Sequence, residues 1–470
     1  MKAIKQLLGD SVVYGIGGLF VRATQIFILP LILIYLKKDE FGVLDYFLNI
    51  KNILIILYGW GILTSIFKYS EKLEKKSKSP FNGILIIIVV SFIGGLIISL
   101  LSLYSNSVNE YWEDLLYVHI ISCFGALFTI PLGVFRLNRK PVNYVALNLF
   151  YTIVLLGSSY YLIITTNYNY KSVLIGHVLA SSLSFIIGLF AIRKDIIFKF
   201  EYSLFKKMLD FGFSILLGSL SFVILLATSR FFLKAGASFE EVGLLGMAQR
   251  ISLFVGALLI SPFALAWLPF VKSKVNDKNF HAIANRVFTS FLWIGLIFTL
   301  TLELIQKDVF LLIGNKEYLP SLSYVIPFSI SYLMQGLYFI FSAGIFLSGN
   351  TKHYKIIGLS SIAFNLTLYL LLYNTISIGV VSYITLLSFV FSVILAYFFG
   401  NKRIKIKVLQ IRNILILLLY SFLFGMVFSF NNLNYNMSLY SLIALKLLFI
   451  GILFSLHLIN ERKVKEKLDS

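Results

Sequence analysis

Long apolar runs alternate with short polar segments from one end of the chain to the other. About 20 apolar residues in a helix are enough to cross the hydrocarbon core of a bilayer. We find fourteen such runs, at residues 12–36, 43–67, 83–104, 115–135, 142–166, 172–192, 211–233, 242–271, 287–305, 322–347, 356–373, 379–400, 413–430 and 439–459. The pattern predicts an all-α polytopic membrane protein with about fourteen transmembrane helices.

The stretch from Lys206 to Phe270 contains two of these runs, joined by a short polar turn. Arg250 lies several residues inside the second run, where a lone guanidinium costs about 2.5 to 3.5 kcal/mol. We therefore expect Arg250 to have a functional or structural partner. Arg230 and Glu303 lie near the predicted helix ends, so we expect both to extend toward the membrane surface.

The basic residues follow the alternation of the loops. Of the 41 Lys and Arg residues, 30 fall in the two termini and every second loop, six fall in the other loops and five fall inside the runs. Cytoplasmic loops carry the excess of Lys and Arg, so this count predicts fourteen membrane helices with both termini in the cytoplasm.

Composition supports a membrane protein. With 59% hydrophobic and 13% charged residues, the chain has too little polar surface for a soluble globule. The net charge of +20 is dispersed over alternate loops, where it faces anionic lipid, so we predict no nucleic-acid partner. No loop is long enough to fold as a separate domain. Function is therefore expected within the helical bundle.

The remaining residue types exclude several functions. The single Cys123 cannot form an intramolecular disulfide, and we expect it to pack as a small apolar residue. His119 and His177 lack a second ligand at metal spacing, so we expect both to be packed or hydrogen-bonded. The chain has no P-loop, nucleophile elbow or paired catalytic carboxylates. We predict no cofactor and no enzymatic activity.

A trace of internal repetition links two segments. Within residues 39–52 and 239–252, superposing Gly42 on Gly243 brings Lys51 within two positions of Arg250. Weak symmetry of this kind is typical of transporters built from two repeats. We predict an N-terminal half at 1–200 with helices 1 to 6, a C-terminal half at 201–408 with helices 7 to 12, and two further helices with a basic tail at 409–470.

Several short motifs occur in the order of a known family. After Lys206 and Lys207 come FG, a Gly/Ser-rich helix, Arg230 followed by Phe, then VG, Arg250 and AWLPF. Further motifs are YLKKDEFGV (35–43), GWGILTSIFKY (59–69), LLIGNKEYLPSLSYVIPF (311–328), SGNTK (348–352) and IGVVSYITLLS (378–388). The order resembles polysaccharide or O-antigen flippases of the Wzx type, in the oligosaccharide flippase family of the multidrug/oligosaccharidyl-lipid/polysaccharide exporter superfamily. One departure is Ser229, where many relatives have Asp.

The resemblance implies a flippase. Its substrate would be an undecaprenyl-pyrophosphate-linked oligosaccharide repeat, moved to the outer leaflet for surface polysaccharide biosynthesis. Besides this lipid and the bilayer, a polysaccharide polymerase complex is the implied partner. Whether the product is an O antigen of lipopolysaccharide, a capsule or an exopolysaccharide stays open, as does coupling to protons or sodium.

The cationic residues inside the membrane are the candidate site. Arg22 shares a small and polar stripe of the first helix with Gln25, Gly15 and Gly18. Two guanidiniums, Arg22 and Arg250, could hold a pyrophosphate through bidentate hydrogen bonds. In relatives, cationic residues of helices 1, 2 and 8 are implied in this contact.

Helix 2 adds further candidates. Asp45, Asn49 and Asn52 form one stripe, and Lys51 lies beside it. Lys51 could add a third cation or extend to the outer interface. Asp45 could neutralise Arg22 or act as a coupling carboxylate.

Two other functions stay open at this point. A multidrug or toxin cation antiporter of the same superfamily would depend on an acidic residue such as Asp45. A membrane polysaccharide polymerase or ligase is less favoured, because the longest outer segment, near 306–321, is short and lacks Arg and His. For a transporter, we expect kinks at Pro30 and Pro262 to let the two halves move.

Overall fold

A computed structural model describes residues 31, 34–70, 77–104, 109–138, 140–275, 277, 280–313, 316–348, 352–408, 410, 413, 416–418 and 420. These residues form helices and connecting turns but no strand, apart from one isolated bridge between Ser77 and Ile196. The chain divides into two compact units. Unit 1 comprises Met1–Gly246 and Leu366–Ser377, and unit 2 comprises Met247–Asn365 and Ile378–Ser470.

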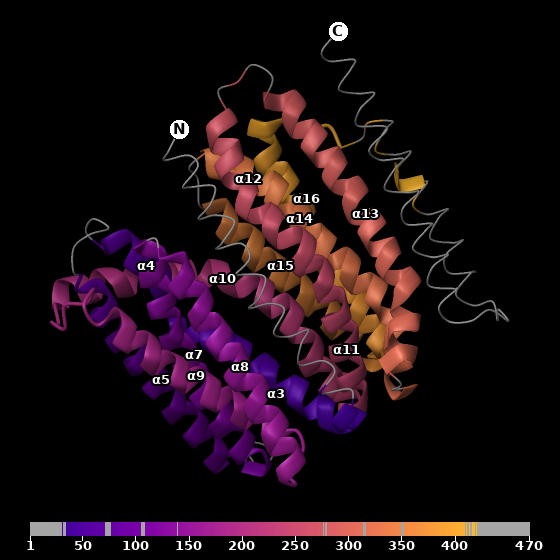
Figure 1. Cartoon of the computed structure of the whole chain (residues 1–470). Helices are drawn as coiled ribbons and strands as arrows, with labels where there is room; N and C mark the ends of the chain where they lie inside the picture. Colours follow the sequence, from indigo (N-terminus) through magenta and orange to yellow (C-terminus); the bar gives the residue numbers. More distant parts are fainter. Residues whose placement is uncertain are drawn as a thin grey trace. The chain divides into compact units, whose positions relative to one another are not determined.

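Unit 1 is a bundle of long helices (Figure 1). They are α3 (Lys38–Gly59), α4 (Ile62–Tyr69), α5 (Ser79–Tyr104), α7 (Trp112–Leu137), α8 (Pro141–Thr165), α9 (Lys171–Ile192), α10 (Tyr202–Gly236) and the start of α11 (Phe239–Val255). Helix α7 packs against α3, α5 and α9, α8 packs on α9, and α10 packs on α3, α4 and α5. The 3-10 turn η3 (Tyr373–Thr375) lies against α10.

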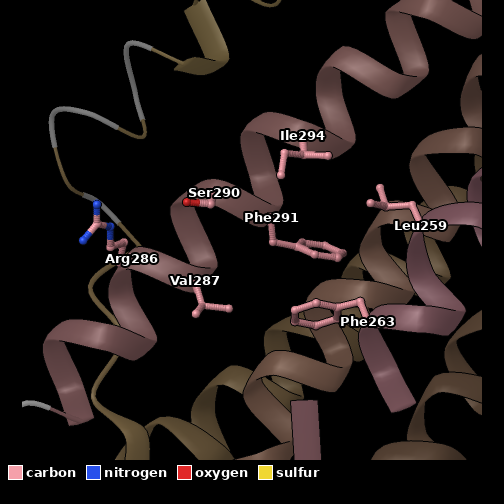
Figure 2. Close-up of a pocket in the computed structure, with 7 residues that line it drawn as sticks. All are labelled: Leu259, Phe263, Arg286, Val287, Ser290, Phe291 and Ile294. Atoms are coloured by element: carbon pink, nitrogen blue, oxygen red, sulfur yellow. The ribbon is translucent and has the colours of Figure 1, made fainter. Parts of the chain in front are cut away.

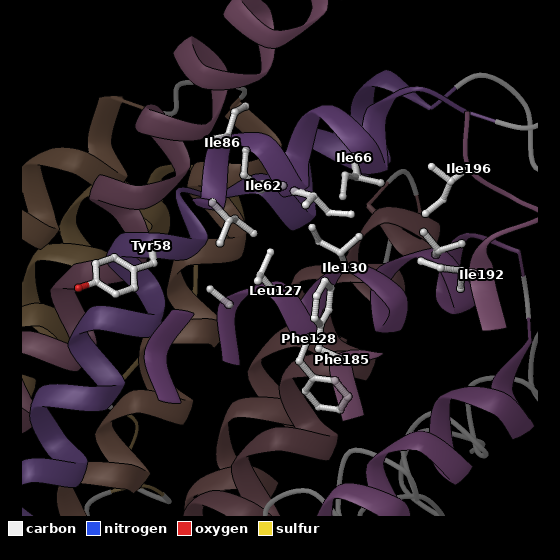
Figure 3. Packing of buried hydrophobic residues seen from close by; sticks show 14 of the residues in the cluster. Tyr58, Ile62, Ile66, Ile86, Leu127, Phe128, Ile130, Phe185, Ile192 and Ile196 are labelled. Atoms are coloured by element: carbon white, nitrogen blue, oxygen red, sulfur yellow. The ribbon is translucent and has the colours of Figure 1, made fainter. Parts of the chain in front are cut away.

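An apolar cluster holds one end of this bundle together (Figure 3). Ile62 and Ile66 of α4 are fully buried against Ile86 of α5 and Ile130 of α7. Branched aliphatic and aromatic side chains from seven helices, α3, α4, α5, α7, α8, α9 and α10, interdigitate there. Close packing of this kind, together with interhelical hydrogen bonds, holds membrane helices together.

The run predicted at 43–67 is broken between α3 and α4. Trp60 and Gly61 have φ values of 45° and 63°, in the left-handed region. A Cβ atom on Gly61 would lie 2.5 Å from the backbone oxygen of Gly212 in α10, and the Trp60 ring nitrogen donates to the oxygen of Leu209 at 3.0 Å. The backbone at the break between α3 and α4 therefore packs directly against α10.

Unit 2 contains the rest of α11, α12 (Ser261–Lys274), α13 (Phe280–Ile313), the 3-10 helix η2 (Lys316–Tyr324), α14 (Val325–Ser348), most of α15 (Lys352–Leu371) and α16 (Ile378–Ile404). Helix α14 packs along α16 and also contacts α12 and α13.

Helices α11 and α12 are joined by a π-helical segment, η1 (Gly256–Ile260). Ser261 closes it by donating from its hydroxyl to the oxygen of Gly256 at 2.7 Å. Pro262 follows directly and has no N–H to continue the ladder. The change from α-helical to π-helical geometry thus occurs beside Pro262, where the sequence predicts a kink.

The all-α polytopic fold is confirmed. Every run predicted between residues 43 and 400 is mainly helical, and ten helical spans among the described residues are long and apolar enough to cross a membrane. The runs at 12–36, 413–430 and 439–459 lie almost wholly outside the described residues.

Candidate functional site

A buried ion pair joins α3 and α10 in unit 1. The Nε atom of Arg230 donates to Oδ2 of Asp45 at 2.6 Å, and the two side chains are only 6% and 5% exposed. Arg230 also donates from Nη1 to the backbone oxygen of Leu226 at 3.2 Å. A buried guanidinium is costly unless its charge and its donors are satisfied, and both are engaged here.

Two further residues fit around Asp45. The amide of Asn49 donates to the backbone oxygen of Asp45 at 2.7 Å, one turn back along α3. On the facing part of α11, a Cβ atom at Gly246 would lie 2.5 Å from Cγ and Oδ2 of Asp45. The carboxylate is therefore held by Arg230, with the Asn49 amide 3.5 Å from its Oδ2 atom, and it faces a position that has room only for glycine.

This pairing corrects one expectation. Arg230 does not extend to the membrane surface, because its side chain is buried against Asp45. Glu303 is partly buried and accepts a hydrogen bond from Gln306 at 2.5 Å. The sequence marked Asp45 but did not show that its partner would come from α10.

The predicted substrate residues lie in different parts of the chain. Lys51 is buried in α3, with 8% of its surface exposed, and Asn52 beside it is exposed. Arg250 is half-buried on α11 and belongs to unit 2. Arg22 and Gln25 lie outside the described residues, so their contact with a substrate stays a prediction.

The two glycines superposed by the internal repeat lie against each other. A Cβ atom on Gly42 would lie 1.7 Å from the oxygen of Phe239, and one on Gly243 would lie 2.2 Å from the oxygen of Lys38. Each oxygen comes four residues before the opposite glycine, so the contact is reciprocal. Helices α3 and α11 cross here with backbones in direct contact, which only small residues allow.

Charged and aromatic side chains surround this crossing. Lys38 Nζ donates to Glu240 Oε1 at 2.5 Å. Phe239 lies edge-on to Tyr46 and Tyr111, with ring centroids 5.9 and 6.0 Å apart, and Lys234 Nζ lies 3.8 Å from its ring centre. Aromatic packing and an ion pair therefore both stabilise the crossing of α3 and α11.

Interactions between loops follow the charge alternation. Lys38 pairs with Glu240, Lys171 pairs with Glu113, and Asn169 donates to Glu40, all within segments that the basic-residue count assigns to the outer side. The opposite set of segments has its own pairs, Lys78 with Glu201 and Lys140 with Asp195. Each pair joins segments assigned to the same side of the membrane.

The two histidines inside the membrane are hydrogen-bonded, as expected. His119 Nδ1 lies 3.0 Å from the Tyr58 hydroxyl, and His177 Nδ1 lies 2.9 Å from the Tyr151 hydroxyl. Cys123 is partly buried and contacts the Ser91 hydroxyl. Within the described part of the chain, no three His, Cys, Asp or Glu residues are grouped to hold a metal ion.

The helical fold is shared with membrane exporters. The chain is similar to the lipid II flippase MurJ in an inward closed conformation, with 17% identity, a TM-score of 0.75 and coverage of 96% of this chain and 99% of that one. It is also similar to the MATE multidrug transporter DinF-BH, with 17% identity, a TM-score of 0.60 and coverage of 85% and 96%. The chain is also similar to the Vibrio cholerae MATE transporter VcmN, with 15% identity, a TM-score of 0.56 and coverage of 85% of this chain and 97% of that one. The chain therefore has the fold that these flippase and multidrug transporter structures share.

The chain belongs to the polysaccharide biosynthesis protein family, whose model matches residues 7–274. This match covers more than half of the chain and confirms the family resemblance drawn from the sequence motifs. A comparison with curated protein sequences gave no match.

Proposed function

We propose that this protein is a flippase. It moves an undecaprenyl-pyrophosphate-linked oligosaccharide repeat from the inner to the outer leaflet of the bacterial cytoplasmic membrane, for surface polysaccharide biosynthesis. Both termini lie in the cytoplasm, as the basic-residue count predicts.

One observation carries the choice of substrate class. The fold of a lipid flippase matches 96% of this chain, whereas the multidrug transporters match 84 or 85% of it. Membership in the polysaccharide biosynthesis family adds the pathway. Together they favour a lipid-linked saccharide over an organic cation.

The proposed site is a cationic cavity in a protein with an N-terminal half at 1–200 and a C-terminal half at 201–408. Lys51, Arg22 and Arg250 bind the pyrophosphate, and Gln25 and Asn52 add hydrogen bonds. A lysine buried at membrane depth, as Lys51 is, is typical of a substrate path.

Alternating access would work around this cavity. The Gly42 and Gly243 crossing would close the outer side and would separate when the site faces outward. Any coupling role of Asp45 would act through Arg230, because the guanidinium occupies one oxygen of the carboxylate.

The test is transfer of a labelled undecaprenyl-pyrophosphate oligosaccharide across liposomes that contain the purified protein. Lys51→Gln, Arg22→Gln and Arg250→Gln should each slow transfer by about tenfold, the value of one hydrogen bond to a charged group. Lys402→Gln changes an exposed lysine at the end of α16 and should leave the rate unchanged. Normal transfer by all three variants, with a folded protein, would remove these residues from the site.

The alternative is a cation antiporter. The buried carboxylate of Asp45 and the fold shared with multidrug transporters favour it. The same liposomes, loaded with an organic cation and given a proton or sodium gradient, distinguish the two functions.

A further inference from the structure

A mainly apolar cleft lies in unit 2 between α13 and the segment formed by η1 and α12, with a volume of about 360 Å³ (Figure 2). Two polar residues, Arg286 and Ser290, lie one turn apart along one edge of α13. The apolar lining comes from Leu259, Phe263, Val287, Phe291 and Ile294. The cleft is thus polar along one edge and apolar elsewhere.

The contacts of Asn285 fix the depth of this cleft in the membrane. Its side chain donates to the oxygen of Lys405 at 3.3 Å and accepts from the N–H of Lys407 at 2.7 Å. Residues 405–407 are not helical, and irregular backbone exposed to lipid does not occur within hydrocarbon. Arg286 therefore lies at the membrane interface, and Ile294 lies about 12 Å deeper along the helix.

The interfacial end of the cleft is positively charged. Lys405 and Lys407 are exposed there, and Arg286 directs its guanidinium away from the apolar side chains (Figure 2). A guanidinium has five N–H donors, so it can hold a phosphate together with a protein partner. A phosphate bound at the interfacial end of the cleft would face these cations, and the apolar part of the cleft would extend from it into the hydrocarbon region.

We propose that this cleft binds an anionic phospholipid of the bilayer, with its phosphate at Arg286 and one acyl chain along Phe263, Phe291 and Ile294. Basic pockets between transmembrane helices on the cytoplasmic side bind anionic lipid head groups in this way. The apolar lining suits a hydrocarbon chain, because it offers almost no polar group that would hold water. The lipid site is independent of the flippase function proposed above.

The test uses phosphatidylglycerol with a photoreactive group in one acyl chain. The purified protein is illuminated in vesicles of this lipid, and the crosslinked peptides are identified by mass spectrometry. Labelling is expected on the segments 259–263 and 287–294. Labelling confined to other helices would overturn the proposal.

Two variants test binding of the lipid head group and of the acyl chain separately. Arg286→Gln should lower the phosphatidylglycerol retained after purification by roughly fivefold, the effect of one cation near the membrane surface. Val287→Trp fills the cleft and should reduce crosslinking to background. Matched controls are Arg193→Gln, an exposed arginine after α9, and Val142→Trp, whose side chain is 72% exposed on α8. Values equal to those of the controls would contradict the site.

A second cleft-filling variant, Ile294→Trp, fills the deeper part of the cleft and covers the case in which Val287→Trp fails to fold.

A competition experiment distinguishes the two lipids. Added undecaprenyl pyrophosphate should not displace phosphatidylglycerol at equal concentration. Displacement would assign the cleft to the transported lipid and overturn the present choice of occupant. Flipping measured in neutral-lipid vesicles tests the proposed function separately.

Discussion

Two carboxylates buried in unit 1 differ in what surrounds them. Asp45 in α3 and Asp114 in α7 are each 4% exposed. Asp45 is bound by Arg230, whereas Asp114 accepts a hydrogen bond on Oδ2 from the Tyr170 hydroxyl at 3.2 Å. The Oδ1 atom of Asp114 has no hydrogen-bond partner among the described residues, and nearby Lys171 pairs with Glu113 instead. Equal burial therefore does not imply an equal structural role.

The largest effect should come from breaking the paired carboxylate. Arg230→Met keeps most of the side-chain volume but leaves Asp45 buried without its cation. Removal of one partner of a buried pair costs about 3 to 5 kcal/mol. The free energy of unfolding in detergent, measured by chemical denaturation, should fall by this amount.

The double variant Asp45→Asn with Arg230→Met sharpens this result. Replacing both charges should restore most of the stability, because neither an ion nor its partner is then left alone. If the two single losses simply add, the pair is not coupled and our account of it is wrong.

An intermediate effect is expected at the glycine that faces Asp45. Gly246→Ala places a methyl group 2.5 Å from the carboxylate, and forced overpacking costs about 1 to 3 kcal/mol. Gly157→Ala is the matched control, because no atom lies within 4 Å of its Cβ position on α8. Thermal unfolding of both variants should show a loss at Gly246 alone.

A smaller effect is expected for the other buried carboxylate. Asp114→Asn keeps an acceptor for Tyr170 and removes the cost of burying a charge. Stability should change by less than about 1 kcal/mol in the same denaturation assay. A loss as large as that of Arg230→Met would show that Asp114 has a charged partner.

The smallest effect belongs to an exposed carboxylate. The hydrogen bond from Lys78 Nζ at 2.7 Å holds the pKa of Glu201 below its usual value. A lowered pKa stabilises the fold above the pKa of the unfolded chain, about 4.3, and this contribution is lost as the pH falls further. Glu201→Gln should remove only this acid-dependent part of the unfolding curve. A change that persists unaltered at every pH would contradict the assignment.

Much of the fold could be predicted from the sequence. Runs of apolar residues define membrane helices because the bilayer requires a minimum length of each. The break at Trp60 and Gly61 was missed, since it depends on the backbone of α10 at Gly212. The π-helical segment at Gly256–Ile260 has only Pro262 as its signal.

The candidate site was harder to predict. Polar residues within apolar runs marked Asp45 and Lys51, because charges inside a membrane are costly. The partner of Asp45 is Arg230, 185 residues away along the chain, and only tertiary packing brings the two together. The Gly42 and Gly243 alignment, in contrast, pointed to two positions that are in direct contact.

The most direct test of the proposed function compares two cargoes in one preparation. Wild-type protein in liposomes is given a labelled undecaprenyl-pyrophosphate oligosaccharide and, in parallel, an organic cation with a proton gradient. We expect the lipid to reach the opposite leaflet and the cation to remain where it was loaded. Gradient-driven cation movement without lipid transfer would contradict the flippase assignment and support the antiporter.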